Sequence, residues 1–441
     1  MLVRRTFGRV VSVRRPTSSP SPGARRRRIQ RPPTTIIVTD ANHGISLPFI
    51  RSLGRGGWRV IAAGADRRGP GLRSRYVTER LVHPPAGRDP LGFAAAIGEA
   101  ARLSEAALVI PLSEAAVLAL TAYRHLIPPA CQLALPDPSD IEIVFNKHRT
   151  IELAQRLGVP VPRTGLAHSP EEAADVAARM TAPFVLKPVS ARLRISGRSR
   201  LGTLHAHDPR AVAVQAARLL PDEDGVLVQE YVAGHGVGVD LLVRDGRTVL
   251  SFQHRRIREV PVFGGPSALR ASVALDPTLF RHATALLGDL RWTGLAMVEF
   301  RVTQDEVHLM EINGRAWGSI SLAVAAGVDF PGALADIYLG SADDGWAEDL
   351  GADPPRSPPA YVVGVRSRDL QLDLVWALSV LLRRPANDIA PWPPRRAGAQ
   401  ALLQMFDPSI GFDVLSRDDP RPGAAELVRI GRYLIRQLAG R

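Results

Sequence analysis

Residues 297–302 read Met-Val-Glu-Phe-Arg-Val and residues 307–313 read Val-His-Leu-Met-Glu-Ile-Asn, with the turn-type sequence Thr-Gln-Asp-Glu between them. A hairpin centred on Asp305 would place Glu299 directly opposite Glu311, with their Cβ atoms about 5 Å apart. Asn313 follows two residues after Glu311 and therefore lies on the same face. Apolar residues occupy the other face, which we expect to pack on a core: Val298, Phe300, Val302, Met310 and Ile312.

The polar face of this hairpin indicates a metal site. Two carboxylates this close repel each other, raise a carboxyl pKa and destabilise the sheet unless a cation lies between them. Oxygen ligands at this spacing suit Mg²⁺ or Mn²⁺ shared with substrate phosphates. Arg315 follows closely and is suited to neutralise a transferring phosphoryl group. The alternative is a solvated face with ordinary charges, but the Gly- and Arg-containing segment 314–318 favours the metal site.

Lys147 and Lys187 are the only lysines, although lysine and arginine together number 56. The two residue types are not interchangeable where a compact ammonium must fit against phosphate oxygens. Lys147 precedes a helical stretch, and Lys187 ends the apolar strand 183–188. The other explanation is that the two lysines remain by chance in a composition biased toward arginine. The contexts of both lysines favour binding of ATP.

The first part of the chain alternates strands with helices. Strands are predicted over 35–39, 58–63 and 107–111, with helices ending near 53 and covering 91–102 and 114–124. This order predicts a parallel sheet with helices on both faces. The loop at 40–46 contains one glycine, so it does not match the dinucleotide-binding pattern G-x-G-x-x-G.

Several polar residues lie on loops at the carboxyl ends of these strands. They are Asn42, His43, Ser113 and Glu114, and they would suit a small anion or a carboxylate. Helix capping is the other role for such residues, and the one we favour. If the loops around 42–44 and 113–114 do bind substrate, they and Arg270 would set its specificity.

The predicted secondary structure changes after residue 182. Strands are predicted over 184–188, 225–232, 237–243, 248–256, 294–302 and 306–313, separated by turns such as 244–247. This spacing indicates an antiparallel, α+β body. Amphipathic helices are expected near 370–382 and 424–438. The sequence therefore divides into a tail (1–33), an α/β domain (34–135), an α+β domain (136–342), a linker (343–359) and a helical appendage (360–441).

The formal net charge of the 441 residues is +13, but ten arginines and no acidic residue lie in residues 1–33. We expect this Arg-, Pro- and Ser-rich tail to be disordered. Contact with nucleic acid or anionic lipid is one interpretation of it. A spurious extension from a misplaced start codon is the other. The tail lacks the apolar segment of a secretory signal, so export is not indicated.

Two further observations bound the class of protein. No apolar run approaches the roughly 18 residues that span a bilayer, so no membrane partner is expected. Cys131 is the single cysteine and cannot form an internal disulfide, so we expect a small buried side chain. The chain is expected to be cytoplasmic. Its oligomeric state cannot be read from the sequence.

Four motifs together resemble the ATP-grasp superfamily, in particular its carboxylate–amine ligase type with a preceding Rossmann-like domain. The motifs are Lys147, Phe-Val-Leu-Lys-Pro at 184–188, Gln-Glu-Tyr-Val at 229–232 and Met-Glu-Ile-Asn-Gly-Arg at 310–315. The run 311–319, continuing into 325–331, is especially similar to the bacterial predicted ATP-grasp group. The resemblance covers roughly residues 34–340. It implies a Rossmann-like domain, then an ATP-grasp fold with antiparallel sheets, then a small C-terminal appendage.

The resemblance implies roles for the matching residues. Lys147 and Lys187 would contact the ATP phosphates, while Glu299, Glu311 and Asn313 would hold two Mg²⁺ ions bridging the β- and γ-phosphates. The segment Gln229, Glu230, Tyr231 and Val232 would form a hinge, in which the backbone at Glu230 and Val232 reads the adenine edge. His235 or Asp240 would contact the ribose. Gln253, Arg256 and Arg258 would face the acyl-phosphate site.

One segment departs from the family pattern. The loop at 190–202, which would fold over the phosphates, is rich in arginine and carries glycine only at Gly197 and Gly202. Backbone amides can still cradle phosphate there. A disordered, solvated loop is the alternative.

The implied reaction is ATP-dependent formation of a C–N bond between a small-molecule carboxylate and an amine. The carboxylate attacks the γ-phosphate to give an acyl phosphate and ADP, and the amine then displaces phosphate. Two metal ions and Arg315 would neutralise the developing charge. Three alternatives stay open: another ATP-grasp product such as a thioester or a carboxylated acceptor, a nucleotide-binding module without turnover, and a nucleic-acid-binding protein acting through its basic tail.

Overall fold

The computed structural model describes residues 34–189, 202–222, 224–340, 361–382, 389 and 392–438. The predicted tail (1–33), the predicted linker (343–359) and all but the last residue of the predicted phosphate loop (190–202) lie outside the described residues. Residues 33–441 form one compact unit. None of the described helices is both long and apolar enough to cross a membrane.

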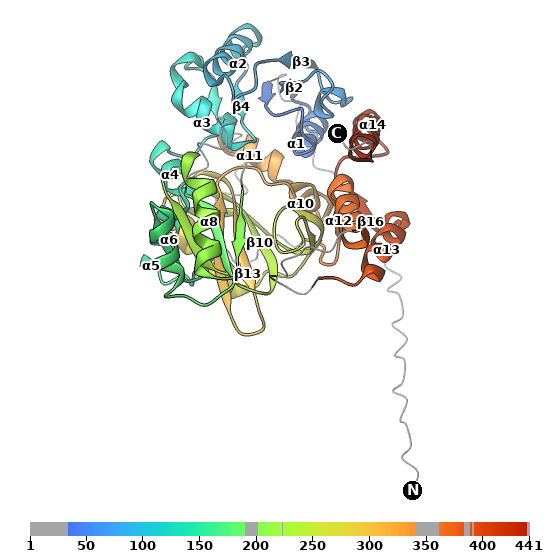
Figure 1. Ribbon diagram of the computed structural model, residues 1–441. Helices are drawn as coiled ribbons and strands as arrows, with labels where there is room; N and C mark the ends of the chain where they lie inside the picture. The colour runs from blue at the N-terminus through green and yellow to red at the C-terminus, as the bar shows by residue number, and fades with distance from the viewer. Residues whose placement is uncertain are drawn as a thin grey trace. The chain divides into compact units, whose positions relative to one another are not determined.

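A five-stranded parallel sheet forms the first domain, in the order β3-β2-β1-β4-β5. Its apolar strand residues pack against helices, with Ile37 and Ile61 in one cluster and Ile36 and Val60 in another. This confirms the predicted Rossmann-like domain. The elements, blue to cyan in Figure 1, are β1 (Thr35–Val38), α1 (Ser46–Arg55), β2 (Arg59–Gly64), η1 (Gly71–Arg73), β3 (Glu79–Val82), α2 (Pro90–Ser104), β4 (Leu108–Ile110), α3 (Glu114–Ala122), η2 (Arg124–Leu126) and β5 (Gln132–Leu133).

The next segment forms a four-stranded antiparallel sheet, in the order β6-β9-β7-β8. Phe184 and Val228 pack in a core with Val212 of α8 and Ala173 of α6. The elements are α4 (Pro138–Val144), α5 (Lys147–Arg156), β6 (Thr164–Ala167), α6 (Pro170–Ala177), β7 (Phe184–Pro188), β8 (Leu204–Ala206), α8 (Pro209–Leu219), η3 (Leu220–Asp222) and β9 (Val226–Glu230).

A seven-stranded sheet follows, in the order β14-β13-β10-β11-β12-β15-β16. All its neighbouring strands are antiparallel except β15 and β16. The elements are β10 (His235–Arg244), β11 (Arg247–Glu259), β12 (Ser267–Ser272), α9 (Pro277–Asp289), β13 (Gly294–Val302), β14 (Val307–Asn313), α10 (Ile320–Ala325), α11 (Phe330–Leu339), β15 (Arg366–Arg368), α12 (Leu370–Leu382), α13 (Arg395–Leu403), η4 (Gln404–Phe406), β16 (Ile410–Phe412) and α14 (Pro420–Leu438). Together the sheets confirm the predicted fold class.

The C-terminal segment is more than helices. The two helices predicted there correspond to α12 and α14, but β15 and β16 also extend the large sheet from its β12 edge. Each of these strands has three residues, which are too few to show an alternation of apolar and polar residues in the sequence. The segment is therefore built into the second body.

The predicted hairpin is present, with one change of register. Glu299 pairs with Glu311 across β13 and β14, as expected. A bulge follows Glu299, so that Phe300 pairs with Leu309 and not with Met310. Leu309 takes the core position, while Met310 lines a cavity on the carboxylate side. The prediction that Met310 packs in the core is therefore wrong.

Cys131 is buried, as predicted, and burial raises the pKa of its thiol to about 11.

Candidate functional site

A cavity of about 500 Å³ lies between the two antiparallel sheets. Its wall includes Lys187 of β7, the segment Glu230–Val232 at the end of β9, and the polar face of the β13–β14 hairpin. Glu114, the first residue of α3, reaches it from the first domain. We refer to it as the hairpin cavity. The residues predicted from separate motifs therefore meet at one place.

Both lysines line the hairpin cavity. Lys147 is the first residue of α5, behind an Asn146 cap whose side chain accepts from the Arg149 amide. Lys187 donates from Nζ to Oε1 of Gln229 at 2.9 Å. Burial lowers the pKa of Lys187 to about 8, and the charge of Glu311 works in the opposite direction. A phosphate placed here would add negative charge beside this buried ammonium.

The paired carboxylates have opposite pKa shifts. Burial raises the pKa of Glu299, and the charge of Glu311 adds to this effect while Arg256 opposes it. Burial would also raise the pKa of Glu311, but Lys147 and Lys187 outweigh it and lower that pKa. Near neutral pH, Glu311 is therefore the securely ionised member of the pair.

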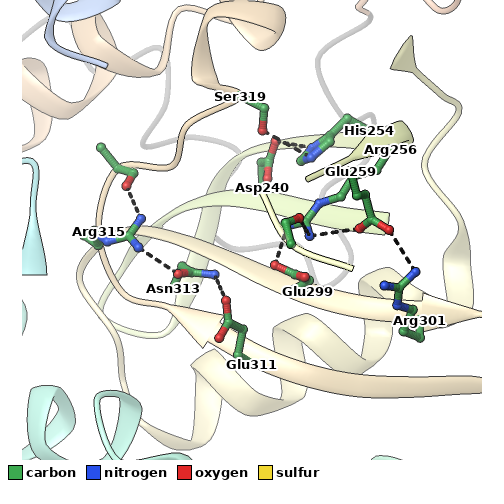
Figure 2. Close-up of polar contacts among 12 residues, drawn as sticks. Asp240, His254, Arg256, Glu259, Glu299, Arg301, Glu311, Asn313, Arg315 and Ser319 are labelled. Atoms are coloured by element: carbon green, nitrogen blue, oxygen red, sulfur yellow. Dashed lines mark hydrogen bonds and ion pairs between the residues drawn. The ribbon is translucent and has the colours of Figure 1, made fainter. Parts of the chain in front are cut away.

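Arginines tie the carboxylates into a network (Figure 2). Arg256 is hydrogen-bonded to Glu299 and lies 3.3 Å from Oε1 of Glu259. Arg301 in turn donates to Oε2 of Glu259 at 3.0 Å. Burial would lower the pKa of Arg256, but Glu299 and Glu259 raise it above its usual range. The result is an alternating row of fixed charges along one side of the cavity.

Arg315 links the hairpin to the first domain. Its guanidinium donates to Oε1 of Glu114 at 3.1 Å and to Oδ1 of Asn313 at 3.0 Å. Asn313 donates from Nδ2 to Oε1 of Glu311 at 3.0 Å. The bonds from Arg315 to Asn313 and from Asn313 to Glu311 are drawn in Figure 2. Strand pairing places Glu299 opposite Glu311 on the same face.

The oxygen set at the hairpin fits a hard divalent cation. Two carboxylates from adjacent strands and one amide oxygen lie on one face, and all three residues line the cavity. Mg²⁺ takes few carboxylates and completes its shell with water and phosphate oxygens. Among the described residues no group of three or more His, Cys, Asp or Glu side chains is arranged for a metal. The fit therefore rests on Glu299, Glu311 and Asn313 together with a phosphate-bearing ligand.

Two residues predicted to contact ribose lie elsewhere. Asp240 is fully buried, and its Oδ2 lies 3.0 Å from Nδ1 of His254. His235 is exposed and does not line the cavity. A Cβ on Gly236 or Gly238 would collide with Arg256 or His254, so the even positions of β10 face the cavity side. His235 therefore points to the opposite face.

Gln253 and Arg258 are also outside the hairpin cavity. Gln253 neighbours His254 on β11 and points to the other face, where its Oε1 accepts from the Asp276 amide at 2.9 Å. Arg258 is displaced by register irregularities on either side of it. It forms two bonds to Asp373, at 2.6 and 2.9 Å, so it has a structural partner.

A buried chain of hydrogen bonds beside the cavity was not predicted from the sequence. Ser319 lines the cavity, and its Oγ lies 3.2 Å from Nε2 of His254, whose other nitrogen contacts Asp240 (Figure 2). Glu259 and Arg301 were missed as well. The acceptor–His–donor order cannot be read from sequence, because the three residues lie on separate elements.

The loops of the first domain divide between two roles. Ser113 caps α3, since its side chain accepts from the Ala116 amide at 3.2 Å. Glu114 reaches the hairpin cavity and binds Arg315. Oδ1 of Asn42 accepts from the Ala65 amide at 3.2 Å, which stabilises its own loop. Arg270 lines the cavity but is also paired with Asp413.

Comparisons with known proteins agree with this architecture. Residues 222–353 match the family model "ATP-grasp in the biosynthetic pathway with Ter operon", and residues 141–244 match "ATP-grasp domain". The carbamoyl phosphate synthase large chain, C-terminal section, of Methanopyrus kandleri is 26% identical over 239 residues. That alignment covers 51% of this chain and 43% of the relative. The large chain from Archaeoglobus fulgidus is 26% identical over 207 residues, which cover 45% of this chain and 19% of the relative.

Solved structures share the fold. A biotin carboxylase–β,γ-ATP complex from Campylobacter jejuni superposes with a TM-score of 0.59 at 15% identity, covering 76% of this chain and 74% of the other. An L-amino acid ligase from Bacillus licheniformis gives 0.52 at 17% identity, covering 68% and 72%.

The fold and the cavity thus define a protein in which a parallel α/β domain precedes two antiparallel sheets that enclose a cationic, carboxylate-bearing site. The family models, which match residues 141–244 and 222–353, identify these parts of the chain as ATP-grasp domains. The chain spans less than half the length of the curated relatives it matches.

Proposed function

We propose that this protein is an ATP-dependent ligase that activates a carboxylate as an acyl phosphate and joins it to an amine, releasing ADP and phosphate. The observation that carries the proposal is the convergence of both lysines, the Glu299–Glu311 pair, Asn313 and Arg315 on one cavity. These groups complement a triphosphate and a divalent cation. The similar structures include an L-amino acid ligase, whose name supports the same class of chemistry.

ATP would lie between the two antiparallel sheets. The segment Glu230–Val232 offers backbone groups to the adenine edge, since the Glu230 side chain is engaged with the Thr181 amide at 2.7 Å. Lys187 and Lys147 would hold the phosphates. Phosphate binding would also raise the pKa of Lys187 from about 8, because it adds negative charge beside a buried ammonium.

Glu299, Glu311 and Asn313 would hold Mg²⁺ or Mn²⁺. When bound, the cation neutralises charge on the transferring phosphoryl group. Glu311 is suited to this role because its lowered pKa keeps it ionised. Arg256 would bind the acyl phosphate or the incoming carboxylate, since it lies beside Glu299 and donates to the Gly265 carbonyl at 3.0 Å.

The chemistry follows from this placement. The substrate carboxylate attacks the γ-phosphorus, and the bond to the β,γ-bridging oxygen breaks to release ADP. The amine then attacks the acyl carbon, loses a proton and expels phosphate. Arg315 stabilises the phosphoryl oxygens from the side of the first domain, where Glu114 orients it at 3.1 Å. Orientation of the reactants supplies most of the acceleration.

A nucleotide-product assay tests the proposal. The protein is incubated with ATP, Mg²⁺ and a pool of amino acids, other carboxylates and bicarbonate. We expect pool-dependent ADP and phosphate, reduced more than about a hundredfold by Glu311→Ala. The matched control is Glu306→Ala on the same hairpin, because the Glu306 side chain is 69% exposed at the turn. Release of AMP and pyrophosphate, or equal rates in the two variants, contradicts the mechanism.

If the mixture of amino acids, other carboxylates and bicarbonate supports turnover, testing its components separately distinguishes a ligase from a carboxylase. A product that needs an amine supports the C–N ligase. A product that forms with bicarbonate alone indicates a carboxylase, and ATP binding without turnover indicates a nucleotide-binding module.

A further inference from the structure

A second, larger cavity lies between the first domain and helix α14. Its volume is about 970 Å³. One wall comes from the segment 66–73 and from β3 of the first domain, and the other from α14. The lining includes seven exposed arginines, of which Arg429 is paired with Glu426. The other six, four from the first domain and two from α14, are Arg67, Arg68, Arg73, Arg80, Arg421 and Arg432. We call it the arginine cavity.

The charge of this cavity is not balanced by its own carboxylates. None of the six arginines forms an ion pair with a described residue. The acidic lining groups are otherwise engaged: Asp66 accepts from the Arg68 backbone amide at 2.9 Å, and Glu426 binds Arg429. Some other exposed arginines are paired, such as Arg102 with Glu99 and Arg156 with Asp289. What distinguishes the six is that all of them surround one cavity.

The two walls are held together by buried bonds beneath the cavity. Asp419, just before α14, is fully buried and accepts from Arg51 Nε at 3.0 Å, Ser74 Oγ at 2.7 Å and the Arg75 amide at 2.9 Å. Because these contacts fix the start of α14 on the first domain, the arginines of both walls face a preformed space. A ligand would not have to bring the walls together.

A smaller cavity borders both the arginine cavity and the hairpin cavity. It has a volume of about 220 Å³. It shares Asn42 and Arg429 with the arginine cavity, and Gly318 and Asp369 with the hairpin cavity. The arginine cavity is therefore separated from the site proposed for ATP by one small cavity.

We propose that the arginine cavity binds a small, multiply charged anion carrying phosphate or several carboxylates. Guanidinium groups present paired N–H donors that match the oxygens of both groups. Several unpaired cations around one space are self-repulsive, and a polyanion removes that repulsion. This site goes beyond the proposed function, and its occupation does not depend on turnover of ATP.

Calorimetric titration of the full chain tests the site, with pyrophosphate and citrate as separate probes. The measurements use a Lys187→Ala background, which weakens anion binding in the hairpin cavity. We expect binding of one or both probes, weakened roughly tenfold by each of Arg67→Gln and Arg432→Gln, which lie on opposite walls. A response to pyrophosphate alone identifies a phosphate site, and a response to citrate alone identifies a carboxylate site.

The control is Arg88→Gln, an exposed arginine of the first domain that does not line the cavity. We expect it to leave both titrations unchanged. Thermal melts verify that each variant is folded. If a glutamine variant is unfolded, Arg67→Lys or Arg432→Lys replaces it, because lysine retains the positive charge but not the paired N–H donors of the guanidinium. Absence of binding, indifference to Arg67 and Arg432, or equal weakening by Arg88→Gln overturns the proposal.

Discussion

At the scale of single residues, a buried chain of polar contacts runs from Asp240 through His254 to Ser319. Asp240 and His254 are fully buried, and Ser319 carries the chain to the wall of the hairpin cavity. Burial raises the pKa of Asp240, while its contact with His254 works against that rise. A buried acceptor with one partner stabilises the fold only while that partner is present.

We expect Asp240→Leu to lower the free energy of unfolding by about 1–3 kcal/mol, because it leaves Nδ1 of His254 buried without an acceptor. Asp240→Asn keeps an oxygen at the same place and should recover most of the loss. Urea unfolding of the two variants measures the difference. Equal midpoints would show that the contact with His254 contributes nothing beyond packing.

The same scale shows which predicted site residues the structure places outside the hairpin cavity. Alternation along β11 puts Arg256 and Arg258 on one face, but irregularities around Arg258 turn its side chain toward Asp373. A bulge adds a residue without changing composition, so no periodicity reveals it. For Gln253 and His235 the alternation was sufficient to exclude them from the cavity face. They were assigned from family resemblance, which carried no information on strand faces.

At the scale of elements, the hairpin was predictable because its signal is local. The pairing of Glu299 with Glu311 follows from a four-residue turn and regular alternation up to the carboxylates. Helix α14 was also predicted, but its docking was not. That docking depends on Asp419, and its partners lie more than 340 residues earlier in the chain. Contacts of such separation leave no pattern in a single sequence.

Adjacent aspartates before α14 provide a matched test of this docking. Asp419 is fully buried with three donors, whereas the Asp418 side chain is 43% exposed and binds Arg55 and Tyr76 at the surface. We expect Asp419→Ala to cost about 3–5 kcal/mol, because it leaves Arg51 without its buried partner. Asp418→Ala should cost less than about 1 kcal/mol, as exposed ion pairs do.

Chemical denaturation of both variants gives the two costs. Similar losses would mean that α14 is held by its apolar face and not by the carboxylate. A large loss at Asp419 alone would also predict weaker anion binding in the arginine cavity, because that cavity needs α14 in place.

At the scale of the whole molecule, the segment 361–441 is part of the fold although it lies outside both matching family models. β15 pairs with β12, so its removal exposes an edge of the large sheet. Arg258 and Arg270 are 8% and 1% exposed, and their partners Asp373 and Asp413 both belong to this segment. Removal would leave two guanidinium groups in the interior without counter-charges.

We therefore expect a chain ending at residue 340 to lose its cooperative native state. Each broken buried pair costs about 3–5 kcal/mol, and two such losses approach the roughly 5–15 kcal/mol by which whole domains are stable. Heat-induced unfolding followed by near-ultraviolet circular dichroism measures the transition. The double variant Arg258→Met, Arg270→Met in the shortened chain removes the orphaned charges but not the exposed edge, and it should recover only part of the stability. A shortened chain that unfolds at the full-length temperature would show that the first 340 residues form an independent body, with the C-terminal segment merely attached to it.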